Sequence, residues 1–255
     1  MIVIKTPDEI EKIHEAGKVV HLCLKSMGEA IVPEKSTTND LESVAMDIIT
    51  SSSGESAFLG YAPYGYSPYP AWTCVSVNEE VVHGIPGKRI LHEGDLVSCD
   101  VGVILNGFYA DAAWTFPVGD VSEADARLLK CGQEALMKAI EFAKVGGRLG
   151  DVCHAVEKHA MRYGYTVVRE LVGHGVGKSL HEEPPIPNYG KPGMGPTLRE
   201  GMTLAIEPMI NEGHSAVEAL EDGWTIVTRD RKRSVHFEHT IAVTRNGPRI
   251  LTGGE

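Results

Sequence analysis

The stretch LVSCDVGVILNGFYAD, residues 96–111, decides the fold of this chain. Apolar residues occupy alternate positions from Val97 to Val103, and Asp100 lies on the opposite face, as in a strand with one buried side. The Asn106-Gly107 pair that follows is a strong signal for a two-residue type I′ turn. The sequence therefore predicts an antiparallel β-hairpin whose first strand covers residues 96–105.

The register of this hairpin brings two carboxylates together. With a two-residue turn Leu105 opposes Phe108, so Gly102 faces Asp111. Asp100 and Asp111 are then diagonal neighbours on one face, with backbones roughly 7 to 8 Å apart. A slip of one residue would place the two acids on opposite faces, so the prediction depends on the length of the turn.

A local repeat predicts that the second half of the chain supplies acids in the same way. The motif LHEG, five intervening residues and Asp100 recur as LREG, five intervening residues and Glu207. We expect a strand over residues 202–206 that ends at Glu207. We also expect a strand over residues 235–243 whose inner face presents His236, Glu238 and Thr240.

Four acids and one histidine form the candidate metal-binding set. The histidine, His174, lies in the motif GHGVG, where small neighbours leave room for a metal or substrate. A single strand carboxylate is more often a solvated group or half of an ion pair. Four in matched strand contexts would repel unless cations lay between them, which indicates a two-metal hydrolase. The set is Asp100, Asp111, His174, Glu207 and Glu238.

Helices are expected in two pairs. The motif TPDE at residues 6–9 has the features of a capping box with proline at N1, so a helix begins there. A second helix is expected over residues 39–50. After the hairpin, Ser122 caps a helix that runs to about residue 143, and another covers residues 151–163. Each half thus has two helices and then strands, which predicts an α+β fold with helical layers over one curved antiparallel sheet.

Composition is typical of a compact enzyme. The chain has 255 residues, of which 42% are hydrophobic and 23% charged, without a linker, so we expect one domain over residues 1–255. Neither a secretory signal nor a membrane span is seen, so we expect a cytoplasmic protein. Five cysteines without CxxC spacing are expected to be reduced thiols. The net charge of −11 disfavours binding to nucleic acid.

Six motifs in a fixed order carry a resemblance to a known family. They are SVNE (76–79), VHGIPG (82–87), GHGVG (173–177), HEEP (181–184), GMTLAIEP (201–208) and EHT (238–240). The sequence closely resembles the bacterial type I methionine aminopeptidases, which have the pseudo-twofold pita-bread fold. The resemblance implies that the five residues above hold two divalent metal ions. The mixed ligand set suits Mn, Fe, Co or Zn.

The resemblance also implies an activity and roles for side chains. Hydroxide activated by the two metals would attack the first peptide bond and release the initiator methionine of nascent proteins, best before a small second residue. Glu207 would move the proton, and His83 and His181 would donate hydrogen bonds to the substrate. The methionine pocket would be formed by His83, Cys74, Tyr69, Leu180, Trp224 and His181, with Tyr61 as a further candidate.

Two features depart from the family pattern. The segment over residues 61–71 is richer in tyrosine and proline than the usual short loop and is longer. The run Asp111-Ala112-Ala113 lacks a hydroxyl that many relatives carry beside the second aspartate.

Two alternatives stay open at this stage. One is a proline-directed peptidase of the same fold, although such relatives usually carry an extra N-terminal domain. The other is a non-catalytic binding module on the scaffold. As partners we expect the N-terminal methionine of nascent chains and a transient contact with the ribosome, with neither a membrane nor a specific nucleic acid, for a monomer.

Overall fold

The computed structural model describes residues 1–63 and 65–254. Its helices are α1 (Pro7–Glu29), α2 (Thr38–Ser51), α3 (Glu123–Phe142) and α4 (Leu149–Tyr163). The capping box at Thr6 is confirmed, since its hydroxyl accepts from the Glu9 amide and the Glu9 carboxylate accepts from the Thr6 amide. Ser122 caps α3 as expected. The helix α4 begins two residues before the expected start.

The strands of the first half are β1 (Glu55–Ser56), β2 (Thr73–Val77), β3 (Glu80–Val82), β4 (Leu96–Leu105) and β5 (Phe108–Pro117). Those of the second half are β6 (Thr166–Val167), β7 (Val172–Gly175), β8 (Glu182–Pro187), β9 (Thr203–Ile206), β10 (Met209–Asn211), β11 (Val217–Ala219), β12 (Ile226–Thr228), β13 (Ser234–His236), β14 (His239–Thr244) and β15 (Gly247–Ile250).

The predicted hairpin of β4 and β5 is confirmed in length and register. Asn106 and Gly107 have φ angles of 52° and 76°, the left-handed conformation that a type I′ turn requires. Gly102 pairs with Asp111, and Asp100 pairs with Ala113. The two aspartates therefore lie diagonally on one face of the hairpin.

The predicted strand over residues 235–243 is wrong in one respect, because it breaks into β13 and β14. The two pieces pair with different strands, β13 with β10 and β14 with β9. At the change of partner, the Glu238 amide donates instead to the Ala113 carbonyl of β5, at 2.9 Å. Glu238 thus lies where the two halves of the molecule meet, opposite the position of Asp100.

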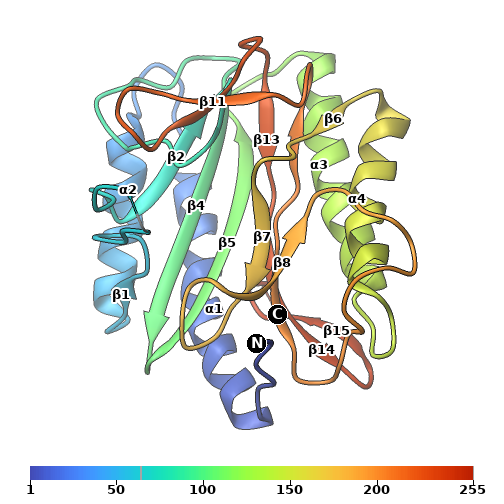
Figure 1. The fold of residues 1–255 in the computed structure, drawn as a ribbon. Coiled ribbons are helices and arrows are strands. Elements are labelled where there is room, and N and C mark those ends of the chain that lie inside the picture. Colours follow the sequence, from blue (N-terminus) through green and yellow to red (C-terminus); the bar gives the residue numbers. More distant parts are fainter. Residues whose placement is uncertain (64, 255) are drawn as a thin grey trace.

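The strands form hydrogen-bonded sheets that are antiparallel throughout the part of the chain described. Their orders are β1-β4-β2 with β5 beside β4, β15-β14-β9-β7-β8, β13-β10-β6 and β11-β12-β3. Figure 1 shows α1 running behind β4 and β5 with α2 beside it, and α3 and α4 next to the strands of the second half. The α+β pita-bread class is confirmed, although the expected single sheet is divided into separately hydrogen-bonded parts.

Each helix pair covers its own apolar core. One core joins α1 and α2 to β2, β4 and β5, and the other joins α3 and α4 to strands of the second half. Trp114 on β5 packs against both cores, and its ring meets Phe237 edge to face with centroids 4.8 Å apart. The five cysteines are free and buried. Within the described part of the chain, no helix combines the length with the apolar character that crossing a membrane requires.

Candidate metal centre

The candidate ligands come from both halves of the sheet. Asp100 and Asp111 extend from the β4–β5 hairpin, and His174 lies on β7, paired with Ala205 of β9. Glu207 follows β9 directly, and Glu238 precedes β14. Because β9 pairs with both β7 and β14, the three residues of the second half converge on the face that the hairpin acids occupy.

Distances confirm that these side chains lie together. Ligand atoms of Asp111, His174 and Glu238 all fall within 4.8 Å of one another. Nε2 of His174 is 3.3 Å from Oδ2 of Asp111 and 3.8 Å from Oε1 of Glu207. Asp100 and Glu207 line the same cavity as these three residues. The structure therefore brings the five sequence-predicted residues into one site.

The hydrogen bond of His174 leaves the correct nitrogen free for a metal. Its Nδ1 lies 2.9 Å from the backbone oxygen of Gly175, which can only accept. Nδ1 must therefore carry a proton, and in the neutral ring Nε2 keeps its lone pair. Nε2 is the atom that faces Asp111 and Glu207.

Burial together with neighbouring charges shifts the pKa values of three of the acids, Asp100, Asp111 and Glu238. Burial, with the charges of Asp111 and Glu207, raises the pKa of Glu238 well above its ordinary value. Burial raises the pKa of Asp100 to about 7, against the opposing effect of His236. Burial also works to raise the pKa of Asp111, but the charge and hydrogen bond of His174 hold it below its usual value. Such mutual repulsion is what a cation would remove.

One buried atom tests whether these residues fit a metal. Oδ1 of Asp100 is buried and has no hydrogen-bond partner among the described residues. An orphaned buried carboxylate oxygen is costly unless a ligand satisfies it. The donor set of four carboxylates and one imidazole also suits a divalent transition metal. The residues present therefore fit a divalent metal site.

Thr240 supports Asp111 from the second half of the sheet. Its hydroxyl lies 2.9 Å from Oδ1 of Asp111 and 2.9 Å from the backbone oxygen of the same residue, and it accepts from the Asp111 amide at 3.2 Å. Asp111 thus has a hydroxyl partner on β14, although the Asp111-Ala112-Ala113 run itself carries none. Hydrogen bonds of this kind orient a metal-binding carboxylate.

The glycines around His174 allow neighbouring strands to pack closely against the backbone of β7. A Cβ on Gly173 would lie 2.5 Å from the Ala205 oxygen, and one on Gly175 would lie 2.3 Å from the Glu183 oxygen. The space that small residues leave here is filled by the neighbouring β8 and β9 backbone. The expectation that it admits a metal or substrate is therefore corrected: the glycines allow three strands to pack around His174.

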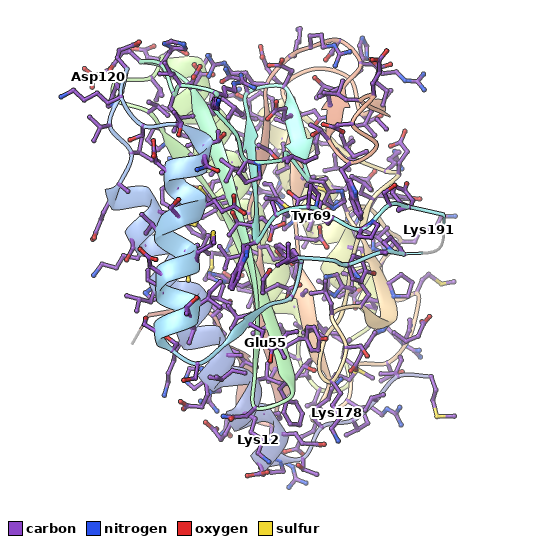
Figure 2. The ribbon with its side chains drawn as sticks, turned by 90° about the vertical axis from the view of Figure 1, so that its left-hand side faces the viewer. Lys12, Glu55, Tyr69, Asp120, Lys178 and Lys191 are labelled. Carbon is purple, nitrogen blue, oxygen red and sulfur yellow. The ribbon has the colours of Figure 1, made fainter. Side chains whose placement is uncertain are left out.

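A cavity of about 310 Å³ leads to the acids and contains every side chain expected in the substrate site. Tyr69, Cys74, Leu180 and Trp224 form a buried cluster with which Tyr61 packs. Figure 2 labels Tyr69 in the middle of the molecule. Its hydroxyl donates to the backbone oxygens of Thr73 or Gly84, at 3.1 and 3.0 Å. Its ring therefore lines the cavity while its polar end holds the turn after His83.

His83 and His181 lie at the same cavity in neutral form. Burial, together with the charge of His236, lowers the pKa of His83 to about 4. Burial and the charge of His174 lower the pKa of His181 to about 4. His83 adopts a φ of 60°, a left-handed conformation that is uncommon for residues other than glycine.

Sequence reasoning missed several residues of the cavity. Phe58, Leu171 and Ile226 line it but lie in stretches without a motif. His236 was placed on the correct face without a role, and its Nε2 lies 3.6 Å from Oε2 of Glu207. A pattern of alternating polar residues before EHT was the available signal for His236. The sequence carried no comparable signal for Phe58, because this residue reaches the site by packing over Gly102.

Comparison with known proteins agrees with this geometry. The family model for metallopeptidase family M24 matches residues 11–245. This chain belongs to metallopeptidase family M24. Within the family it groups with the methionine aminopeptidases. It is 47% identical to the methionine aminopeptidase of Clostridium acetobutylicum and to methionine aminopeptidase 1 of Bacillus subtilis, each match covering 99% of both chains.

Solved structures agree with the M24 assignment. The methionine aminopeptidase of Thermotoga maritima superimposes with a TM-score of 0.95 at 50% identity, over 100% of both chains. A prolidase from Pyrococcus furiosus shares the fold, with a TM-score of 0.78 at 24% identity, but this chain spans 66% of its length. That likeness shows the fold alone. The proline-directed alternative is therefore not favoured.

Proposed function

We infer that this chain is a metal-dependent methionyl aminopeptidase that removes the N-terminal methionine from polypeptides. The observation that carries this conclusion is the meeting of Asp111, His174 and Glu238, from both halves of the sheet, at the end of a cavity with an apolar and aromatic lining. The buried acidic cluster argues against a non-catalytic binding module, since repulsion among the acids costs stability that such a module would have no reason to lose.

For the cofactor we propose two divalent ions of Mn, Fe, Co or Zn, held by Asp100, Asp111, His174, Glu207 and Glu238. Two ions are supported by the number of ligands, because four carboxylates can bridge or bind separate ions. The orphaned oxygen of Asp100 and the free Nε2 of His174 support metal binding at this site. When bound, such ions lower the pKa of water and stabilise the oxygen charge that develops during peptide hydrolysis.

Side chains of the site would supply proton transfer and hydrogen bonds to the substrate. We propose that Glu207 takes a proton from the attacking water and passes it to the leaving amine, as a general base and then a general acid. Its two oxygens lie near Nε2 of His174 and Nε2 of His236, at 3.8 and 3.6 Å. His83 and His181 would donate hydrogen bonds to the substrate as charge shifts toward its carbonyl oxygen.

The cavity explains a preference for methionine. A thioether is unbranched, polarisable and attracted to aromatic rings, which suits a pocket of Tyr69, Cys74, Leu180 and Trp224. The ring of Trp224 stands edge-on to Tyr69 and to His83, at centroid distances of 5.1 and 6.0 Å, so it closes one wall. We propose that His83 and His181 border this pocket on the side of the metals, and that small second residues are favoured.

The cellular setting follows from the substrate. Nascent chains carry the initiator methionine at the ribosome, so we propose a cytoplasmic monomer that contacts the ribosome transiently. Five buried free thiols are consistent with a reducing compartment. Neither a membrane nor a specific nucleic acid is proposed as a partner.

A metal-reconstitution panel tests the proposal. Protein stripped with a chelator is loaded with Mn²⁺, Fe²⁺, Co²⁺ or Zn²⁺ and assayed with Met-Ala-Ser, Met-Leu-Ser and Ala-Pro peptides. We expect metal-dependent release of methionine that is fastest from Met-Ala-Ser. Absence of turnover with all four metals would overturn the conclusion, and turnover of Ala-Pro alone would replace it with proline-directed cleavage.

A further inference from the structure

Tyr61 and His181 are 120 residues apart in the chain and meet at the cavity. The Tyr61 hydroxyl lies 2.6 Å from Nδ1 of His181, and the ring centroids are 5.2 Å apart. The contact joins the tyrosine-rich segment that departs from the family pattern to the HEEP motif. The inference below rests on the proposed function.

The backbone holds Tyr61 in place for this contact. Its amide donates to the Phe58 oxygen at 2.9 Å, and its carbonyl accepts from the Tyr69 amide at 2.8 Å. Gly60 donates to the Tyr69 oxygen at 2.9 Å, which completes a pair of bonds between the two ends of the segment. The Tyr61 ring packs against the buried cluster that contains Leu180, the residue before His181. Its position therefore does not depend on the exposed tip of the segment.

The direction of the hydrogen bond follows from the two groups. A lone pair on an imidazole nitrogen is a stronger acceptor than a phenol oxygen, and a neutral phenol is a good donor. Burial raises the pKa of Tyr61, so its hydroxyl keeps the proton. We propose that Tyr61 is a positioning residue that donates to Nδ1 of His181 and holds this imidazole in the tautomer with its proton on Nε2.

The neighbouring His174 shows the opposite arrangement. The two rings are 4.4 Å apart at an interplanar angle of 68°. At His174 the Nδ1 partner is a backbone oxygen, so Nε2 is left with a lone pair for a metal. At His181 the Nδ1 partner is a hydroxyl, so Nε2 carries a proton. Two adjacent histidines thus receive different tautomers, and different tasks, from what faces Nδ1.

The tautomer decides what His181 can do in the cavity. A substrate carbonyl oxygen can only accept hydrogen bonds, so Nε2 must carry the proton to bind it. The other tautomer presents a lone pair, which would repel that oxygen as its charge grows. Tyr61 therefore contributes to turnover through His181, more in the transition state than in substrate binding.

The experiment combines NMR with kinetics on the full chain. The Zn²⁺-loaded protein, labelled with ¹⁵N-histidine, reports the protonated nitrogen of His181, which is assigned from the signal lost in His181→Asn. We expect Nε2–H in the wild type at pH 7.5 and a mixture of tautomers in Tyr61→Phe. For Met-Ala-Ser, Tyr61→Phe should lower kcat roughly fivefold to tenfold and leave KM within about twofold.

A matched control removes a tyrosine hydrogen bond elsewhere. The Tyr163 hydroxyl donates to Glu134 at 2.7 Å, on the face between α3 and α4, so Tyr163→Phe should change neither kcat nor the His181 tautomer. Nδ1–H in the wild type, or unchanged tautomer and kcat in Tyr61→Phe, would overturn the proposal. If Tyr61→Phe does not fold, the wild-type spectrum still decides the tautomer. Wild-type protein that releases no methionine would refute the proposed function, while the spectrum still tests the contact.

Discussion

Lys5 and Glu182 form a buried ion pair directly beside His181. Their side chains are 3% and 11% exposed. The second oxygen of Glu182 accepts from the Lys178 amide at 2.9 Å, and the Lys5 amide donates to the Gly201 oxygen at 2.8 Å. The N-terminal segment is thus bonded to the turn between β7 and β8.

Lys178 and Lys12 are labelled at the same end of the molecule in Figure 2, and both ammonium groups lie near the Phe108 ring, at 5.6 and 5.7 Å from its centroid.

Removal of one partner of this pair should destabilise the fold strongly. Lys5→Met leaves the Glu182 carboxylate buried without its cation, so the free energy of unfolding should fall by roughly 3 to 5 kcal/mol. Lys12→Met breaks an exposed pair with Asp8 and should cost under about 1 kcal/mol. Urea unfolding of both variants measures the difference. Equal midpoints would show that the Lys5–Glu182 pair contributes little.

Thr240 should control metal affinity through Asp111. Thr240→Val keeps the shape of the side chain and removes the hydroxyl that holds the Asp111 carboxylate. We expect the Kd for Mn²⁺, measured by calorimetry, to rise roughly 10- to 100-fold. Thr244→Val, on the same strand, removes a bond to the Gly247 oxygen outside the site and should leave the Kd unchanged. If Thr240→Val binds Mn²⁺ with the same Kd as Thr244→Val and the wild type, Thr240 does not control metal affinity.

The metal-free protein should lose stability as the pH rises from 7 to 9. Burial works to lower the pKa of His174, but Asp111 and Glu207 outweigh it and raise this pKa from 6.5 to about 9. The folded state therefore binds a proton that the unfolded state releases, and this stabilisation is lost as pH rises through the folded pKa. The loss should be on the order of 3 kcal/mol at most.

Calorimetric Tm values of chelator-treated protein at pH 7, 8 and 9 check this slope. His174→Asn lacks this titrating group and should make the slope shallower, while Asp100 and Glu238, whose pKa values are also raised, keep part of it. Bound Zn²⁺ should also weaken the slope, because a ligated imidazole carries no proton on Nε2. A Tm of the metal-free wild type that rises across this range would contradict the assignment.

Leu180 should contribute to the methionine pocket. Leu180→Ala removes apolar surface at a buried position, 5% exposed, and leaves the pocket too wide for a thioether. Loss of this contact should lower kcat/KM for Met-Ala-Ser roughly 10-fold or more. Leu22→Ala, at a 48% exposed position of α1, serves as the control with unchanged kinetics. The pocket assignment fails if both variants match the wild type in the peptide assay.

The hairpin and its acids could be predicted from the sequence because local rules govern them. Side chains alternate along a strand, and Asn106-Gly107 restricts the turn to two residues, so the pairing of Gly102 with Asp111 follows from neighbours in the chain. The capping box at Thr6 is equally local. The repeat around Asp100 and Glu207 extended the same reasoning to the second half.

Contacts between distant segments followed no local rule, and only the tertiary structure decided them. Glu238 lies at a break between β13 and β14 because the chain changes partner there, which depends on where β5, β9 and β10 lie. The bonds from Thr240 to Asp111 and from Tyr61 to His181 likewise join segments far apart in sequence. The sequence by itself determined that Asp100 and Asp111 share one face of a hairpin, since strand alternation and turn length are short-range. Packing of the two halves determined which groups orient them, since that requires the whole core to form.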